Sequence, residues 1–240
     1  MAGHSVWKNI KHRKAAVDAK RGKIWSKLSR AVIVAARTGG VDPKFNSALR
    51  LAILDAKAGN MPRDTIEKAV KKGAGGLESE RYEPTRYEGF GPGGVAVVVE
   101  ALVANTNRTA PEIRTIFDKN DGKIGVPNSV RFGFVQQGIL LIVREATTED
   151  ALMEIALAAG ADDVQCGDEG WQITCTPAMF GAVREALEAA KIPVESAQIE
   201  YVPLNTVSVD EATIQTVEKL VEALEDHDDV QRVHTNLSRD

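Results

Sequence analysis

Residues 138–203 read GILLIVREATTEDALMEIALAAGADDVQCGDEGWQITCTPAMFGAVREALEAAKIPVESAQIEYVP, and this stretch decides the fold class. Four short apolar runs alternate in it with two segments of helical periodicity. In chain order we expect a strand at Ile139–Val143, a helix from Thr148, strands near Val164 and at Trp171–Cys175, a helix from Pro177 under a Thr176 cap, and a strand at Val194–Val202. This order, βαββαβ, is typical of a ferredoxin-like domain, so we expect an α+β protein.

The segments that flank this unit complement each other. Each holds a strand–helix–strand pattern: Val95–Val99, a capping box at Thr109–Glu112 and the alternating Val130, Phe132 and Phe134 before the unit, and Val207, Ile214–Leu224 and Val230–Leu237 after it. Because each set is incomplete alone, residues 77–137 and 204–240 are expected to form one discontinuous, ferredoxin-like α/β domain. Residues 138–203 would then be inserted into it.

Residues 1–76 predict a third domain, which is a helical bundle. Apolar residues recur there at spacings of three and four, namely Ile24, Trp25, Leu28, Val32 and Ala35, then Phe45, Leu49, Ala52, Ile53 and Ala56. Asp42-Pro43 is a typical helix start, and Gly73–Gly76 reads as a linker.

The net charge of −4 conceals a strong separation of charge along the chain. Residues 1–76 contain 17 Lys and Arg against 5 Asp and Glu, which gives +12. The rest contains 13 basic and 29 acidic residues, which gives −16. Such a separation predicts that the N-terminal domain binds a polyanion and that the remainder repels it.

Candidate nucleic-acid contacts lie in the densest basic stretch. They are Lys8, Lys11, His12, Arg13, Lys14, Lys20, Arg21, Lys23 and Lys27, with Trp7 as a possible stacking residue. A solvated basic helix face is the alternative for the cations, and packing is the alternative for Trp7. Trp25 lies on the apolar stripe and is expected in the core.

Patterns typical of catalysis are weak, so we expect no enzyme, no cofactor and no metal site. Gly89, Gly91 and Gly94 spell GxGxxG, but a strand-like run follows them, so we interpret them as a Gly-Pro turn. The acidic run Glu225–Asp229 is interpreted as exposed acid at a helix end. The two cysteines, Cys166 and Cys175, are expected to be buried free thiols.

Location and assembly follow from similar arguments. The longest apolar runs have strand length and cannot span a bilayer, and no signal peptide is visible, so we expect a cytoplasmic protein without membrane partners. No heptad seam is visible either, so we expect a monomer.

Several motifs resemble the YebC family along the whole chain. They are the N-terminal Ala2-Gly-His-Ser-x-Trp-x-Asn-Ile-Lys-His-Arg-Lys14, Asp18-Ala-Lys-Arg-Gly-Lys23, Gly59-Asn-Met-Pro62, Tyr87-Glu-Gly-Phe-Gly-Pro-Gly-Gly94 and Asn107-Arg-Thr109. Val6 departs from the family, which usually has Lys there, and so does Val126-Pro-Asn128. The resemblance implies three domains, no catalytic residues, and basic contacts at the positions above other than Lys27. Members are described as DNA-binding transcriptional regulators or as translation factors that act at the ribosome.

Two hypotheses therefore remain for the function, an RNA- or ribosome-associated translation factor and a DNA-binding transcriptional regulator. We favour the first, because the sequence offers a broad basic patch without a visible helix-turn-helix reading head. The acidic domains would contact ribosomal or transcription proteins, or prevent unspecific coating of nucleic acid.

Overall fold

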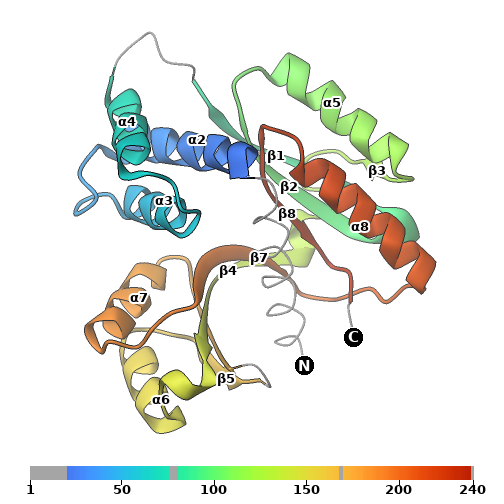
Figure 1. Cartoon of the computed structure of the whole chain (residues 1–240). Helices are drawn as coiled ribbons and strands as arrows, with labels where there is room; N and C mark the ends of the chain where they lie inside the picture. Colours follow the sequence, from blue (N-terminus) through green and yellow to red (C-terminus); the bar gives the residue numbers. More distant parts are fainter. Residues whose placement is uncertain (1–20, 76–80, 168–169, 239–240) are drawn as a thin grey trace. The chain divides into compact units, whose positions relative to one another are not determined.

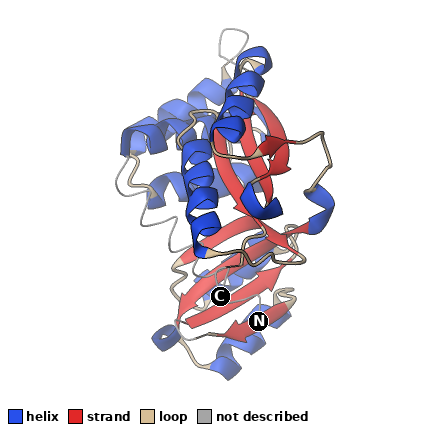
Figure 2. Ribbon diagram, turned by 90° about the vertical axis from the view of Figure 1, so that its right-hand side faces the viewer, coloured by secondary structure: helices blue, strands red, loops and turns tan. Residues whose placement is uncertain are grey.

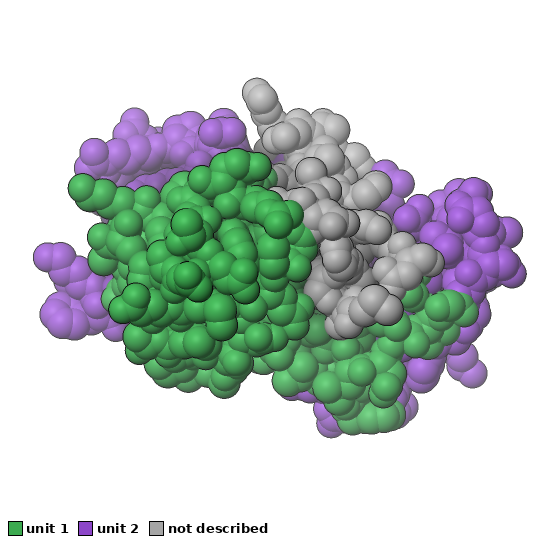
Figure 3. Space-filling model, turned by 90° about the horizontal axis from the view of Figure 1, so that it is seen from below, with its two compact units in different colours: residues 1–14, 132–208, 238–240 green, residues 15–131, 209–237 purple. Residues whose placement is uncertain are grey.

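The computed structural model describes residues 21–75, 81–167 and 170–238, which form an α+β protein with two four-stranded sheets (Figure 1). Within these residues the chain divides into two compact units, one of residues 132–208 and the other of residues 21–131 with 209–237 (Figure 3). The expected α+β class is confirmed, and the chain does leave the second unit and return to it.

The helical part of the second unit contains three helices, α2 (Arg21–Gly39), α3 (Ser47–Ala58) and α4 (Arg63–Ala74). Its core consists of Val32, Ile33, Ala36, Leu49, Ala52, Ala56, Met61, Ile66 and Ala69. Trp25 packs against this core and donates from Nε1 to the Gly59 carbonyl at 2.9 Å, as its place on the apolar stripe predicted. At Gly73 the helices α2 and α4 approach closely, since a Cβ there would lie 2.6 Å from the Ala36 Cβ.

The prediction for the start of α3 is wrong. Asp42-Pro43 begins a turn, and α3 begins at Ser47 with Asn46 as its N-cap. Phe45 therefore precedes the helix, and its side chain is 88% exposed. Asn46 Oδ1 accepts the cap hydrogen bond from the Leu49 N–H at 3.0 Å.

Sheet A of the second unit has the order β3-β1-β2-β8, with all neighbours antiparallel. Figure 2 shows the strands in red and the helices in blue. Its strands are β1 (Glu83–Phe90), β2 (Ala96–Val103), β3 (Lys123–Ile124) and β8 (Val230–Thr235). The helices α5 (Thr106–Lys119) and α8 (Glu211–Glu225) pack on the same face of the sheet. Their shared core consists of Val97, Val99, Ile113, Phe117, Leu220, Leu224, Val230 and Val233.

Three local predictions for this unit require correction. The helix α5 is capped by Asn105, so the predicted Thr109–Glu112 capping box lies inside the helix. A hairpin of β1 and β2 precedes α5, where a single strand was expected. Val207, which was expected in a strand, forms only an isolated bridge.

Sheet B lies in the unit of residues 132–208 and has the order β5-β6-β4-β7. Its strands are β4 (Phe134–Val143), β5 (Asp163–Cys166), β6 (Gly170–Cys175) and β7 (Ser196–Pro203), and its helices are α6 (Glu149–Ala158) and α7 (Phe180–Ala189). The chain order is the expected βαββαβ.

Some details of this unit differ from the sequence analysis. The boundary expected at residue 138 falls inside β4, and α7 begins three residues after Pro177. Phe132 lies in a short 3-10 turn and is 79% exposed, although the alternating pattern placed it in a half-buried strand. Cys175 is buried but Cys166 is exposed, because the latter lies on the short edge strand β5. Among the described helices, none is both long and apolar enough to cross a membrane.

Candidate nucleic-acid interface

Most of the predicted contact residues lie outside the described part of the chain. These are Trp7, Lys8, Lys11, His12, Arg13, Lys14 and Lys20. Arg21 is described only as the first residue of α2. Of the eight predicted Lys and Arg contacts, the structure therefore places the side chains of Lys23 and Lys27.

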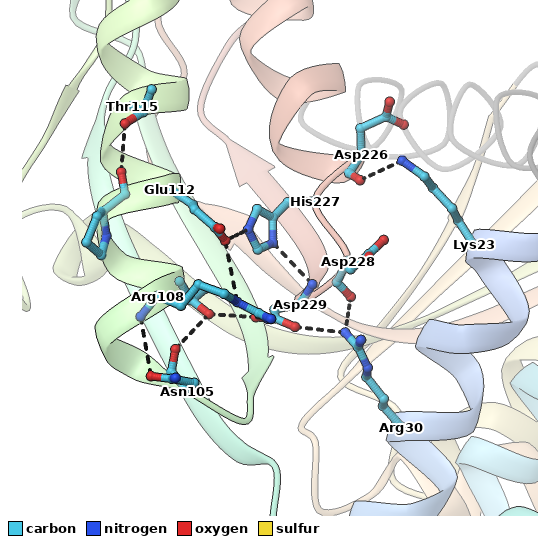
Figure 4. Close-up of polar contacts among 12 residues, drawn as sticks. Lys23, Arg30, Asn105, Arg108, Glu112, Thr115, Asp226, His227, Asp228 and Asp229 are labelled. Atoms are coloured by element: carbon cyan, nitrogen blue, oxygen red, sulfur yellow. Dashed lines mark hydrogen bonds and ion pairs between the residues drawn. The ribbon is translucent and has the colours of Figure 1, made fainter. Parts of the chain in front are cut away.

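These two lysines and Arg30 lie on one face of α2, since they follow each other at spacings of four and three. Lys23 Nζ donates to the Asp226 carbonyl at 3.3 Å (Figure 4). Lys27 Nζ donates to the Glu225 carbonyl. These carbonyls belong to the C-terminal end of α8, where backbone acceptors lack helical partners and the helix dipole is negative. The end of α8 thus holds two of the cations that were predicted to contact phosphate, Lys23 and Lys27.

The contact with α8 partly removes Lys27 from solvent. Burial disfavours its charged form and lowers the pKa of its ammonium group, although Glu225, Asp226 and Asp228 act in the opposite direction. A lysine that is desolvated against its own protein is poorly placed to meet a phosphate in this conformation. We therefore place Lys27 at the edge of the candidate interface.

Arg30 continues the same contact into a buried carboxylate. Its Nη1 donates to the Asp228 carbonyl and to Asp229 Oδ1, the latter at 2.9 Å. Its guanidinium also lies 5.3 Å from the centroid of the Tyr82 ring. Arg30 thereby fixes α2 to the turn between α8 and β8.

Asp229 is the centre of this network, and its side chain is only 1% exposed. Its Oδ2 accepts from Arg108 Nη2 at 3.0 Å and from the Thr109 hydroxyl at 2.6 Å (Figure 4). Burial by itself would raise the pKa of Asp229, but the bonds from Thr109 and Arg108 and the charge of Arg30 outweigh it, so the pKa lies below its usual range. The carboxylate joins α2, α5 and the α8–β8 turn.

His227 extends the network to the surface. Its Nδ1 accepts the Asp229 backbone N–H at 3.1 Å, and its Nε2 lies 3.0 Å from Glu112 Oε2. The interpretation of Glu225–Asp229 as exposed acid is therefore wrong for Asp229. Nothing in the local sequence distinguishes Asp229 from exposed Asp228, because its three side-chain partners lie 120 or more residues away.

The glycine-rich segment at Gly89–Gly94 forms a turn before a strand, as its sequence predicted. Gly93 has a positive φ of 69°, and a Cβ there would lie 2.7 Å from the Val209 side chain. The central strand β2 follows this turn, as expected of a turn that packs on its own unit. In the described ranges, no group of three or more His, Cys, Asp and Glu side chains is placed to hold a metal ion.

Exposed cations are nevertheless abundant on the helical part. Residues 21–75 contain 12 basic and 4 acidic residues, a net charge of +8. The exposed lysines among them are Lys23, Lys44, Lys57, Lys68, Lys71 and Lys72. Together with the basic residues before Lys23, they make the helical part the candidate interface.

Two family models match this chain. One is described as the TACO1/YebC protein N-terminal domain and matches residues 5–76, and the other is described as the TACO1/YebC second and third domain and matches residues 82–237. The chain belongs to the TACO1/YebC family.

Relatives in this family match along the entire chain. A protein named "Probable transcriptional regulatory protein" from Rubrobacter xylanophilus is 50% identical over 99% of this chain and 95% of its own length. A protein of the same name from Natranaerobius thermophilus is 48% identical over 100% and 97%. The crystal structure of the conserved hypothetical protein Aq1575 from Aquifex aeolicus is similar with a TM-score of 0.82 at 47% identity, and the match covers 92% of both chains. The resemblance to the YebC family is confirmed.

Proposed function

We propose that this TACO1/YebC-family chain is a non-enzymatic, monomeric regulator of gene expression that binds nucleic acid in the cytoplasm through its N-terminal helical domain. The separation of charge carries the proposal. The described helical residues 21–75 have a net charge of +8, residues 1–20 add +4, and the remaining 165 residues have a net charge of −16. Such a domain is expected to bind a polyanion, because each phosphate that it neutralises releases counterions and so increases the affinity. The names of the relatives support a regulatory role.

The structure refines which cations we assign to phosphate. Lys23 and Lys27 donate to backbone carbonyls of α8, so they contribute less than their place in the sequence suggests. We assign the main contact to the basic residues between Lys8 and Arg21, supported by the exposed lysines of the loop before α3 and of α4.

The salt dependence of binding tests this assignment. If five or six phosphates are contacted, the slope of log K against log salt should be roughly −3 to −5.

Replacing four N-terminal cations by glutamine should nearly abolish binding without unfolding the protein; these are Lys11, Arg13, Lys14 and Arg21. A matched control neutralises four exposed cations elsewhere, which are Lys119, Lys123, Arg144 and Lys191. Equal affinity of the two variants would contradict the assignment.

For the nucleic acid itself we favour folded RNA at the ribosome, with a role in translational activation or relief of stalling. Cations spread over several helices position a protein on phosphates without reading a base sequence. The shape of folded RNA and adjoining basic proteins would define such a site, and residues 77–240, with a net charge of −16, offer surfaces of opposite charge to those proteins.

The second candidate is a DNA-binding transcriptional regulator, and the names of the relatives favour it. Co-sedimentation with ribosomes that is lost at high salt would support the first candidate. A sequence-selective duplex footprint at physiological salt, without ribosome association, would support the second.

A further inference from the structure

The loop between α2 and α3 presents an aromatic side chain to solvent. Phe45 is 88% exposed, and Val41 in the same loop is 48% exposed. Nothing in the apolar core of this part requires an aromatic residue here, because Phe45 does not belong to that core. Aromatic side chains in basic surroundings are the positions on which the bases of single-stranded nucleic acid stack.

The loop is held in this form by Asn46, whose side chain is buried. Its Nδ2 donates to the Ala35 carbonyl at 2.8 Å and to the Gly40 carbonyl at 2.7 Å, and its Oδ1 accepts from the Leu49 N–H at 3.0 Å. A Cβ at Gly39 would approach this amide to 2.7 Å, so glycine leaves the room that the amide needs. These three hydrogen bonds of the Asn46 side chain fix the chain on both sides of Phe45.

The backbone next to Phe45 is fixed as well. The N–H groups of Phe45 and Asn46 donate to the Asp42 carbonyl at 3.1 and 3.0 Å. The Asp42 carboxylate accepts from the Lys44 backbone N–H at 2.9 Å. The aromatic ring is therefore carried by a preorganised turn, which lowers the entropy that a bound partner would remove.

The charge around Phe45 selects the kind of partner. The exposed Lys44 precedes it, the Asp42 carboxylate is occupied by the turn itself, and the domain that carries the loop has a net charge of +8 over its described residues. A partner that satisfies both features is a polyanion with accessible flat apolar faces. Unpaired bases of single-stranded nucleic acid have this combination, whereas bases in a duplex are stacked on each other.

We infer that Phe45 is a stacking platform for an unpaired base of single-stranded nucleic acid, with Lys44 beside the adjoining phosphate. This inference rests on the proposed function and deepens it, because it specifies the strandedness of the ligand. Stacking on the Phe45 ring tolerates any base, so it adds affinity without base-sequence preference.

The test measures fluorescence anisotropy of a labelled, unstructured oligoribonucleotide of about twenty nucleotides, and of the same sequence as a duplex. Phe45→Ala should weaken single-strand binding roughly 5- to 140-fold, which corresponds to the loss of one base–aromatic stack. Phe45→Leu should weaken single-strand binding to a similar extent, whereas Phe45→Trp should retain the affinity of the original protein. Duplex binding should change less than about two-fold in all three variants.

Phe132 provides the matched control, since it is also a highly exposed phenylalanine but lies in the other unit. Phe132→Ala should leave single-strand binding within about two-fold of the original protein. Because the Phe45 side chain is so exposed, its variants should have the same melting temperature as the original protein, which thermal denaturation measures.

The outcomes separate this inference from the proposed function. If the original protein binds neither oligonucleotide, the proposed function fails and the inference fails with it. If it binds with the expected salt dependence but Phe45→Ala binds the single strand equally well, the inference alone is overturned. If Phe45→Leu retains full binding while Phe45→Ala loses it, the residue acts as an apolar contact, as in a protein pocket, and stacking is overturned.

Discussion

Replacing Asp229 by asparagine should lower the free energy of unfolding at neutral pH by about 2–4 kcal/mol. Asparagine has nearly the same shape, so the change removes the charge and one acceptor without opening a cavity. Asp229 is 1% exposed and accepts hydrogen bonds from two elements besides its own, α2 and α5. Its loss should loosen the attachment of α2 to the α8–β8 turn.

The magnitude follows from the separate contacts. The pair of Arg30 and Asp229 joins side chains that are 16% and 1% exposed, and a hydrogen bond to such a charged group contributes about 1.5–3 kcal/mol. The Thr109 hydroxyl, at 2.6 Å, would keep an acceptor but lose roughly half of the bond strength, because its partner becomes neutral. Arg108 is 55% exposed, and we assign no contribution to it.

Asp228→Asn is the control, because it removes the same charge from an exposed neighbour. It should change stability by less than about 0.5 kcal/mol. Urea denaturation gives the free energies, and hydrogen exchange by mass spectrometry should locate the loss of protection in α2 and the start of β8. Equal stability of the two variants would refute the structural role of Asp229.

The difference between the two variants should also depend on pH. Because the pKa of Asp229 is depressed in the folded state, its stabilisation is complete above the unfolded value of about 4 and is lost as the pH falls through the folded value. The variants should therefore converge in acid. A constant difference down to about pH 2 would show that its charge is not the cause.

Three further predictions concern packing and titration. The Glu88 carboxylate accepts hydrogen bonds from three backbone N–H groups of a following loop at 2.8–3.0 Å, and these bonds outweigh the effect of burial and lower the pKa of Glu88. Glu88→Gln should therefore lower the free energy of unfolding at neutral pH by about 1–3 kcal/mol, measured by urea denaturation, and this loss should shrink below about pH 4. Gly73→Ala should lower the free energy of unfolding by about 1–3 kcal/mol, because a Cβ at this position would overpack the contact between α2 and α4. Gly181 in α7 has open space around it, so Gly181→Ala should raise the free energy of unfolding by up to about 1 kcal/mol. Equal effects of the two variants would contradict the close packing at Gly73. In the folded protein a thiol reagent should modify Cys166 but not Cys175, because burial raises the pKa of the Cys175 thiol to about 11; two fast-reacting thiols would contradict this.

Features that each segment expresses by itself were predictable from the sequence. The βαββαβ order of sheet B follows from runs of apolar residues whose period depends only on the segment's own conformation. The core of α2 follows from spacings of three and four for the same reason. The charge separation is a sum over residues, so it requires no structure.

Element boundaries were less predictable where two signals competed. Asp42-Pro43 and Thr109–Glu112 both have the composition of helix starts, yet Asn46 and Asn105 provide the caps. A cap is chosen by where the chain can turn and bury its apolar face, which depends on neighbouring elements. The same competition removed Phe45 from a periodic stripe that it fits by spacing alone.

Only the tertiary structure decided what the charged residues of α2 do. By sequence, Lys23 and Lys27 continue the basic stretch, and Asp229 is one acid among several. In the structure Lys27 and Arg30 meet the end of α8 and the turn after it across about two hundred residues of chain, and Asp229 is the buried counter-charge of Arg30 and Arg108. A charge pattern reports which groups are present, whereas desolvation and hydrogen bonding depend on which distant backbone lies opposite each group, and that is settled only when the chain is packed.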